Sequence, residues 1–393
     1  MNTLRRLVVL VAAILIASHV FAAGAGETDA KTGQIKAGFV YVGPIGDYGW
    51  SHAHDVARKT LDEEFDWLET VYVESVPEGD AGRIIDRMIQ QEKCNVIFTT
   101  SFGYMDDTIT AGEKYPDVTF MHCSGFKQSE NVGTYFGDLY QTYYLNGLMA
   151  GALTKTGKIG YVAAFPIPEL VRHIDAFALG IKATNPDAEV HVRWTYAWYG
   201  PDKAKEAAEA LISDGCDALA FTEDTPSVIE VGQDNTERGN QIYTFSHYSP
   251  MQQYGPDSVV SGQLIDWSVM YRKILGDIRD GNWTNEDLWW LAAEDVAILG
   301  GDFDSIVNPK FQAELKSAKV DDPDFGNISV YELIEKRYEQ MNTDGPSVFD
   351  PFEGPISDNE GTVRIAAGGR ATKEELLSIM YYVDNVVGSV PSE

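Results

Sequence analysis

Cysteine is scarce in this sequence. The chain of 393 residues contains three cysteines, Cys94, Cys123 and Cys216, and an odd number cannot pair completely. Each lies in or beside an apolar run typical of a buried strand, which favours free, buried thiols. A disulfide between Cys94 and Cys123 remains the alternative. No cysteine stands near the N-terminal cleavage site discussed below, so we expect no lipid attachment there.

Basic residues are also few. The chain has 30 lysines and arginines against 60 aspartates and glutamates, which gives a formal net charge of −30 at pH 7. This excess of negative charge argues against nucleic acid and anionic lipid surfaces as partners. It is typical of a soluble protein, and it does not identify a ligand.

Long apolar runs are absent outside the N-terminus. There, the basic start MNTLRR, the apolar run LVVLVAAILIASHVF and the small residue Ala22 are typical of a secretory signal peptide over residues 1–22. An uncleaved N-terminal anchor is the alternative. The small and polar residues 23–34 then predict a flexible linker. We therefore expect a soluble protein in the periplasm or another extracytoplasmic space.

Signatures of metal sites and nucleophilic catalysis are missing as well. The sequence has no Cys-x-x-Cys, His-Glu-x-x-His or Gly-x-Ser-x-Gly motif. His52 and His54 stand close together, but the preceding turn predicts a helix capped by Ser51, in which residues i and i+2 point about 200° apart. We expect His54 to be a structural, hydrogen-bonded histidine near Arg58. We predict no metal, cofactor or catalytic residue.

An enzyme such as a nucleoside hydrolase would need clustered carboxylates for metal binding or acid–base chemistry. The carboxylates near the predicted strand ends do not form such a cluster in the sequence: Asp47, Asp55, Asp106 and Asp107. The glycines Gly43, Gly46 and Gly49 lack the spacing of dinucleotide-binding or phosphate-binding loops. The sequence therefore favours a binding protein over an enzyme.

What the sequence does contain is a regular alternation of strand and helix patterns. Apolar, strand-like runs such as 35–42 and 94–101 alternate with amphipathic stretches such as 81–91. Strand–helix–strand units of this length predict right-handed crossovers and parallel sheets. The pattern breaks at 155–158 and then starts again. The predicted fold class is therefore α/β, with two doubly wound parallel-sheet lobes.

Ligands of open parallel sheets bind beyond the carboxyl ends of the strands. In this sequence those ends are rich in aromatic and acidic residues and poor in lysine and arginine. The candidates are the aromatic residues Trp50, Phe102, Tyr104, Trp198, Tyr199 and Trp267 and the acids Asp47, Asp224 and Asp266. Stacking contributes about 1–3 kcal/mol per ring face, and carboxylates accept hydrogen bonds, so this set predicts a neutral nitrogen heterocycle, with or without a sugar, as ligand. The alternative is that individual tryptophans anchor the cores of the lobes.

Several segments together resemble one family. They are KAGFVYVGPIGDYGWSHAHDVARK, FTTSFGYMD, YLNGLMAGAL, FPIPELVRHIDAFALGIKATNP, LIDW, DLWW and DPFEGPI. In this order they resemble the basic membrane protein (BMP) family, type I periplasmic substrate-binding proteins of ABC importers that include purine nucleoside receptors. The resemblance implies two hinged lobes that close on a ligand like a Venus flytrap. We accordingly assign residues 35–156 and about 263–283 to lobe 1, and residues 157–262 and part of 284–393 to lobe 2 and the crossing segments.

The resemblance also implies roles for individual residues. Trp50 would stack on one face of a purine and Trp198 on the other, with Tyr199 as the substitute for Trp198. Asp266 would make a polar contact with the base. Ser51 takes the place where nucleoside receptors of the family often have asparagine.

Three departures from the family pattern matter. Many relatives are lipoproteins, whereas this chain lacks the lipobox cysteine. The GDYGWSHAHD variant resembles a branch with Gly-Asp-x-Gly-Trp, which favours a free base such as adenine over a nucleoside. His247 stands where nucleoside receptors are expected to have an acidic residue.

The hypothesis from the sequence is a monomeric, non-enzymatic binding protein outside the cytoplasmic membrane. It would bind a purine base or purine nucleoside between its lobes and deliver it to an ABC permease of the inner membrane. The alternative is a type I sugar-binding or ligand-sensing protein partnered with a membrane receptor.

Overall fold

The computed structural model describes residues 34–343 and 349–392. The predicted signal peptide and nearly all of the predicted linker lie outside the described residues. Within the described part of the chain, no helix combines the length and the apolar character needed to cross a membrane.

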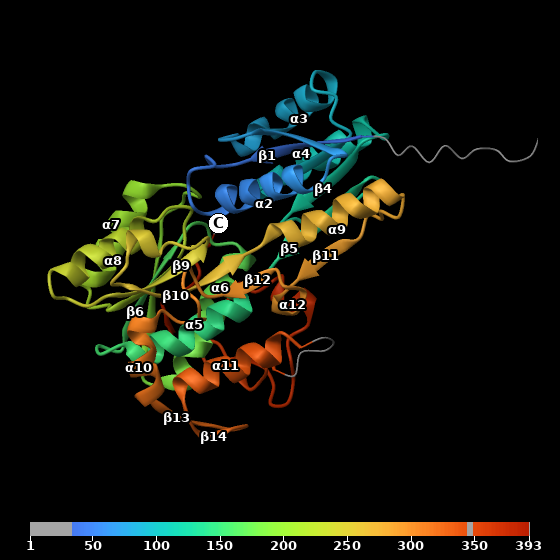
Figure 1. The fold of residues 1–393 in the computed structure, drawn as a ribbon. Coiled ribbons are helices and arrows are strands. Elements are labelled where there is room, and N and C mark those ends of the chain that lie inside the picture. The colour runs from blue at the N-terminus through green and yellow to red at the C-terminus, as the bar shows by residue number, and fades with distance from the viewer. Residues whose placement is uncertain (1–33, 344–348, 393) are drawn as a thin grey trace, which may run out of the picture.

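The first of two large sheets has six strands and is parallel throughout (Figure 1). Its strand order is β11-β5-β4-β3-β1-β2. The strands are β1 (Ile35–Tyr41), β2 (Leu68–Val73), β3 (Val96–Thr100), β4 (Thr119–Cys123), β5 (Val132–Gly137) and β11 (Asp287–Trp290). The edge strand β11 thus comes from a distant part of the chain.

The second sheet has seven strands in the order β12-β10-β9-β8-β6-β7-β17, and only the β10–β12 pair is antiparallel. The strands are β6 (Lys158–Ala163), β7 (Glu189–Trp194), β8 (Ala218–Thr222), β9 (Tyr243–Tyr248), β10 (Val259–Ile265), β12 (Ala297–Leu299) and β17 (Val386–Val387). Two small antiparallel pairs lie nearer the C-terminus: β13 (Lys319–Asp322) with β14 (Gly326–Ser329), and β15 (Ile356–Ser357) with β16 (Val363–Ile365). The predicted α/β class with two parallel-sheet lobes is confirmed.

Helices connect these strands. The α-helices are α2 (Trp50–Glu64), α3 (Ala81–Gln90), α4 (Met105–Lys114), α5 (Tyr140–Leu153), α6 (Pro168–Thr184), α7 (Pro201–Ser213), α8 (Ser227–Glu237), α9 (Trp267–Asp280), α10 (Pro309–Ser317), α11 (Val330–Met341) and α12 (Lys373–Leu376). Short 3-10 turns are η1 (Glu78–Asp80), η2 (Phe102–Tyr104), η3 (Gln252–Tyr254) and η4 (Ala292–Glu294).

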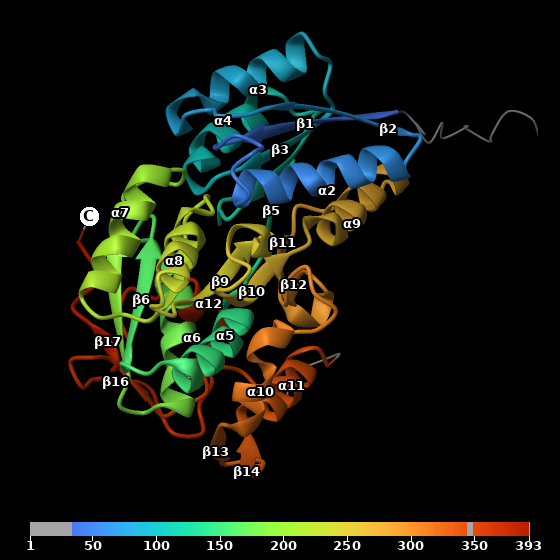
Figure 2. The same ribbon diagram turned by 60° about the vertical axis from the view of Figure 1, so that its left-hand side comes forward.

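Helices cover both faces of the first sheet (Figure 2): α2 and α9 pack together on one face, and α3 and α4 on the other. The period of two along a strand explains this arrangement. Phe39 and Tyr41 belong to the core beneath α2, whereas Val40 belongs to the core beneath α3. A strand buried on both faces requires a continuous apolar run, as the sequence has at 35–42 and 94–101.

In the second lobe, α5 and α6 pack so closely that glycine is required at their contact. A Cβ atom added at Gly147 would lie 2.1 Å from the carbonyl oxygen of Phe177, and one at Gly180 would lie 2.0 Å from that of Tyr144. The two backbones therefore touch, and any larger residue at either glycine would push the helices apart.

The described chain crosses between the lobes three times: between β5 and α5, between β10 and α9, and between β11 and β12. The predicted lobe 1 range 35–156 includes α5, but α5 packs against α6 and β10 of the second lobe. The side chains of α5 are buried on every side of the helix, so its pattern does not indicate which sheet it covers. The crossover therefore comes before α5 and not after it.

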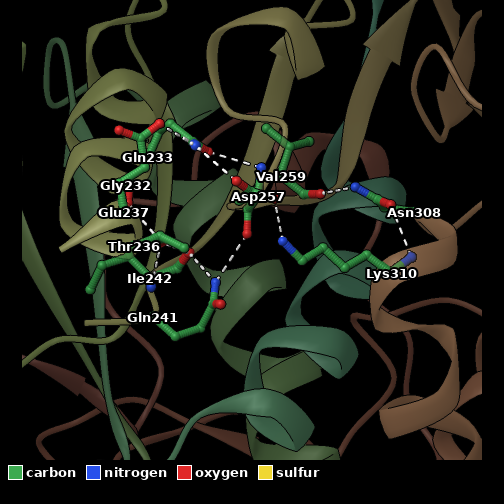
Figure 3. Close-up of polar contacts among 10 residues, drawn as sticks. All are labelled: Gly232, Gln233, Thr236, Glu237, Gln241, Ile242, Asp257, Val259, Asn308 and Lys310. Carbon is green, nitrogen blue, oxygen red and sulfur yellow. Dashed lines mark hydrogen bonds and ion pairs between the residues drawn. The ribbon is translucent and has the colours of Figure 1, made fainter. Parts of the chain in front are cut away.

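The C-terminal part of the chain is attached to the second lobe. Figure 3 shows a polar network in which the Asp257 carboxylate accepts hydrogen bonds from Lys310 and Gln233, and the Asn308 side chain donates to the carbonyl oxygen of Val259 over 2.8 Å. It ties α8, β10 and α10 together. A final segment, residues 349–392, runs along α6 and pairs β17 with β7; we call it the C-terminal strap.

Candidate ligand-binding site

A cavity lies between the lobes at the carboxyl ends of both sheets. It encloses about 390 Å³ of empty space, part of it open to solvent. Its lining residues end a strand, lie in the loop after one or stand in the first turn of the next helix: Val42, Trp50, Ser101, Phe102, Ser124, Glu169, Leu170, Trp198, Thr222, Asp224 and Tyr248. We call it the base pocket. Its position agrees with the rule that open parallel sheets bind ligands at their strand ends.

Trp50 forms a fixed wall of the base pocket. Its side chain is only 7% exposed, and its Nε1 donates a hydrogen bond to the carbonyl oxygen of Thr100 over 2.7 Å. The rings of His54 and Trp267 pack edge-on against it at centroid distances of 4.6 and 5.4 Å. Because packing and a hydrogen bond hold the indole, its orientation does not depend on a ligand.

The turn before Trp50 is organised by Asp47. The Asp47 carboxylate accepts hydrogen bonds from the backbone N–H groups of Gly49, Ser51 and His52 at 2.8, 3.2 and 3.0 Å. Asp47 thus satisfies the free donors at the start of α2, the task predicted for Ser51. The Ser51 hydroxyl instead accepts a hydrogen bond from the N–H of Gly43 over 3.0 Å. Both side chains are buried behind the pocket and do not line it.

Trp198 lines the opposite side of the base pocket, from the loop after β7. Its ring is half-buried and lies 4.9 Å from that of Phe165. The adjacent Tyr199 is 47% exposed and does not line the pocket. The second wall is therefore a loop side chain with less support than Trp50.

Asp224 connects the two lobes. Its Oδ1 accepts a hydrogen bond from the backbone N–H of Trp50 over 2.9 Å, and the side chain is almost completely buried. Burial raises the pKa of Asp224 well above its ordinary value, and the negative charge of Asp47 adds to the rise. Burial also raises the pKa of Asp47, to about 7. The pocket thus contains a carboxyl group whose charged form would be stabilised by any additional hydrogen-bond donor.

Glu169 supplies a second acid in the pocket. The Ser124 hydroxyl donates a hydrogen bond to its Oε2 over 3.2 Å, again across the lobes. Burial raises the pKa of Glu169 to about 7, although the positive charge of Arg172 opposes the rise. Among the residues that line the base pocket there is no lysine or arginine. The site therefore offers aromatic faces and hydrogen-bond acceptors.

Three predicted site residues lie in the protein interior or cap a helix. Tyr104 donates its hydroxyl to the carbonyl oxygen of Val76 over 2.6 Å in the core beside α3. Trp267 is fully buried and stacks on His54 at 4.3 Å, and Asp266 caps α9 by accepting from the N–H of Ser268 over 2.9 Å. Because β10 ends at a crossover, the chain carries Asp266 and Trp267 behind Trp50 and away from the pocket.

His247 also lies beneath the pocket and does not line it. Its Nδ1 is 3.0 Å from the Tyr143 hydroxyl, and the next residue along β9, Tyr248, reaches the pocket instead. Tyr248 has a left-handed backbone conformation with a φ of 60°, so the regular alternation of β9 ends there, and its ring centroid lies 3.7 Å from that of His247. Of the eleven predicted site residues, those that line the base pocket are Trp50, Phe102, Trp198 and Asp224.

The sequence analysis did not select Tyr248, Glu169 or Ser124. All three belong to strand-end segments, so the rule that selected Trp50 could have found them. Tyr248 ends β9 directly after His247, and Glu169 lies in the first turn of α6, where an acid also suits the helix dipole.

The two histidines of the first turn contact different groups. His52 Nδ1 lies 2.9 Å from the carbonyl oxygen of Ile45, and His54 Nδ1 lies 2.5 Å from the Tyr271 hydroxyl. Arg58 pairs with Asp55 and not with His54. No group of three or more potential metal ligands occurs among the described residues.

The three cysteines are buried and free, as the sequence predicted, and the alternative disulfide is not formed.

Comparisons with known proteins agree with this geometry. A putative ABC transporter glucose-binding protein of Haloferax volcanii is 41% identical over 266 residues, which cover 68% of this chain and just under two thirds, 66%, of that protein. A purine-binding protein of Brucella abortus is 34% identical over 372 residues, or 94% of this chain and 96% of that protein. A solved ABC transporter solute-binding protein from Aeropyrum pernix shares the fold, with a TM-score of 0.66 and 16% identity over 78% of this chain and 91% of that one.

The family model described as ABC transporter substrate-binding protein PnrA-like (Bmp) matches residues 34–329. This match covers the first sheet, every strand of the second sheet except β17, all three crossovers and every residue that lines the base pocket. The chain therefore belongs to the Bmp family of ABC transporter substrate-binding proteins.

Proposed function

We propose that this protein binds a purine base or purine nucleoside outside the cytoplasmic membrane and delivers it to an ABC permease. The observation that carries the proposal is one pocket with Trp50 and Trp198 on walls from opposite lobes and with Asp224 and Glu169 beside them. Two ring faces and two acceptors suit a flat heterocycle with N–H or amino donors at its edge.

The energetics support this ligand class. Each stacked face contributes about 1–3 kcal/mol by comparison with base–aromatic contacts in nucleic-acid complexes. Asp224 and Glu169 are buried at a cost that hydrogen bonds from a ligand would reduce. The absence of lysine and arginine from the pocket lining disfavours nucleotides, whose phosphates need cationic or N–H-rich sites.

The purine-binding protein of Brucella abortus supports the same proposal, because its similarity extends over almost the whole of both chains. Substrate-binding proteins of ABC importers are in general not enzymes, and this chain is proposed to act without chemical conversion of its ligand.

A sugar is the second candidate ligand, favoured by the similarity to the putative glucose-binding protein of Haloferax volcanii. Sugar rings also stack on tryptophan and donate hydroxyl hydrogens to carboxylates. A sugar lacks a flat aromatic system, however, and would not make full use of two tryptophan walls.

The test is a ligand titration of protein that has been unfolded, dialysed and refolded to remove any bound solute. Adenine, hypoxanthine, adenosine, guanosine, ribose and glucose are titrated, and calorimetry and tryptophan fluorescence are recorded. A purine is expected to bind and a free sugar is not. Binding of glucose or ribose without any purine would replace the proposal with the sugar alternative, and release of adenine from adenosine would contradict the non-enzymatic role.

A further inference from the structure

The turn before Trp50 also contacts the opposite lobe, through two residues that do not line the base pocket, Tyr48 and Gly49. The Tyr48 ring packs edge-on against that of Tyr254 in η3, with a centroid distance of 5.1 Å and an interplanar angle of 80°. Tyr48 also packs against the apolar cluster of the second lobe beneath α7 and α8. A side chain of lobe 1 is thus inserted into lobe 2.

Contacts within lobe 1 hold Tyr48 in this position. Its φ is 62°, a left-handed conformation that is uncommon for a bulky residue. Its ring stacks on that of His52 at a centroid distance of 4.8 Å, and His52 Nδ1 lies 2.9 Å from the carbonyl oxygen of Ile45. A strained conformation persists only where surrounding contacts hold it, and such residues cluster at functional sites. The ring is therefore supported from both sides of the cleft.

Gly49 lets the two backbones come together. A Cβ atom added at Gly49 would lie 2.5 Å from both the Cα and the Oδ1 of Asp224, and its three nearest atoms would all belong to Asp224. No side chain fits into so small a space. Because the atoms that limit this space belong to the second lobe, a methyl group at Gly49 would push the lobes apart.

Asp224 connects this contact to both walls of the base pocket. Its Oδ1 accepts a hydrogen bond from the backbone N–H of Trp50 over 2.9 Å. Its own backbone N–H donates to the carbonyl oxygen of Trp198 over 3.0 Å. One residue thus joins the backbones of the two tryptophans, and the approach of Gly49 to Asp224 sets the spacing between the walls.

We infer that Tyr48 and Gly49 are positioning residues for ligand binding. Their contacts with Tyr254 and Asp224 hold the lobes at the spacing that lets both walls touch one ligand, and neither residue touches the ligand itself. This goes beyond the proposed function, because it applies to any ligand bound between the walls. Contacts of this kind raise the affinity of every such ligand by the same factor, mainly by slowing its dissociation.

The first test compares Gly49→Ala with Gly46→Ala, a matched control in the same turn. A Cβ atom at Gly46 has no atom within 4 Å. Adenine and hypoxanthine are titrated by calorimetry. Gly49→Ala should weaken the binding of both by the same factor, at least about tenfold, because the added methyl group meets the opposite lobe. Gly46→Ala should change either affinity by less than about twofold. Equal urea-unfolding midpoints for the two variants would show that both fold correctly.

The second test is a double-mutant cycle on the two tyrosines. Tyr48→Ala and Tyr254→Ala should each weaken adenine binding by about tenfold, because each removes the same aromatic pair and the apolar area that it buries. The double variant should lose no more than either single variant. Stopped-flow tryptophan fluorescence should show the loss as faster dissociation, with the association rate unchanged.

The inference is overturned if Gly49→Ala binds adenine as tightly as the wild type does, or if it changes the ratio of the adenine and hypoxanthine affinities. It is also overturned if the losses of Tyr48→Ala and Tyr254→Ala add in full. The proposed function survives all three results. If the wild type binds glucose or ribose and no purine, the proposed function is wrong, and the same losses measured with that sugar would still support the inference.

Discussion

The two tryptophan walls of the base pocket differ in how they are held. Trp50 is part of the core of lobe 1, with its Nε1 bound to the Thr100 carbonyl and three aromatic rings, His54, Trp267 and Tyr248, packed edge-on around it. Trp198 stands in a loop and contacts one ring, that of Phe165. The first wall is built before a ligand arrives, and the second can adjust to what the first has bound.

Because of this difference, we expect Trp50 to contribute to both folding stability and ligand binding, and Trp198 to contribute mainly to ligand binding. A change at Trp50 should affect both, because the indole belongs at once to the core and to the pocket. A change at Trp198 should affect binding with little effect on folding. Variants at the two positions, and at the acids between them, test that division.

The largest effect is expected for Trp50→Ala. Removing a buried indole should lower the free energy of unfolding by about 3–5 kcal/mol, and binding should become too weak to measure. Trp50→Phe is the control: it keeps a ring in the wall and loses the hydrogen bond to Thr100, at a cost of about 1 kcal/mol. Urea denaturation and calorimetry measure both quantities. A loss of stability below about 1 kcal/mol for Trp50→Ala would show that Trp50 is not part of the core.

Trp198→Ala should weaken purine binding by about 1–3 kcal/mol, roughly 5-fold to 150-fold, because one stacked face is lost. The free energy of unfolding should fall by no more than about 1 kcal/mol, since the side chain is half-buried in a loop. The same two measurements apply. The comparison between the walls fails if this variant is destabilised as strongly as Trp50→Ala.

Glu169→Gln should change how stability depends on pH. In the folded protein the carboxyl keeps its proton up to about pH 7, whereas the ordinary pKa is 4.5, so between these values the native state holds more protons than the unfolded state. The free energy of unfolding therefore falls as pH rises through this window. The stabilising contribution of the protonated Glu169 carboxyl is complete only below the window.

In Glu169→Gln, thermal unfolding should show a smaller difference in midpoint between pH 5 and pH 8 than in the wild type. Some pH dependence should remain, because burial also raises the pKa of Glu223 to about 8 and that of Asp47 to about 7. Equal pH dependence in both proteins would mean that Glu169 is solvated and ionised throughout. The Arg172 and Ser124 groups that face Glu169 are unchanged in this variant.

The smallest effect is expected for Tyr199→Ala, one residue after Trp198. The side chain is exposed and does not line the pocket, so stability should change by less than about 0.5 kcal/mol and purine affinity by less than about twofold. An affinity loss equal to that of Trp198→Ala would show that the loop turns Tyr199 into the pocket when ligand binds.

The sequence predicts the fold well because short apolar runs indicate buried strands, and amphipathic stretches with apolar residues three or four apart indicate helices. The exception is α5: a helix apolar on all sides has no face that indicates its neighbour, so it was assigned to the wrong side of the first crossover.

At the site, strand ends could be located but the direction of their side chains could not. His247 and Tyr248 follow each other in β9, and Tyr248 reaches the pocket from a left-handed backbone conformation that its residue type does not indicate. Asp266 and Trp267 follow β10 directly, but they stand at a crossover that carries them into lobe 1. Such choices depend on tertiary contacts across more than 200 residues, as between His54 and Tyr271.

The late position of β11 has a consequence for how this protein is made. Its partner, β5, is complete at Gly137, but β11 is complete only at Trp290, after the strands β6 to β10 of the second lobe have been synthesised. Until then the β5 edge has no neighbour on that side and can pair with another chain. Contacts between such distant segments form slowly. Aggregation during overproduction should therefore begin from chains whose second lobe has folded while the β5 edge is still open.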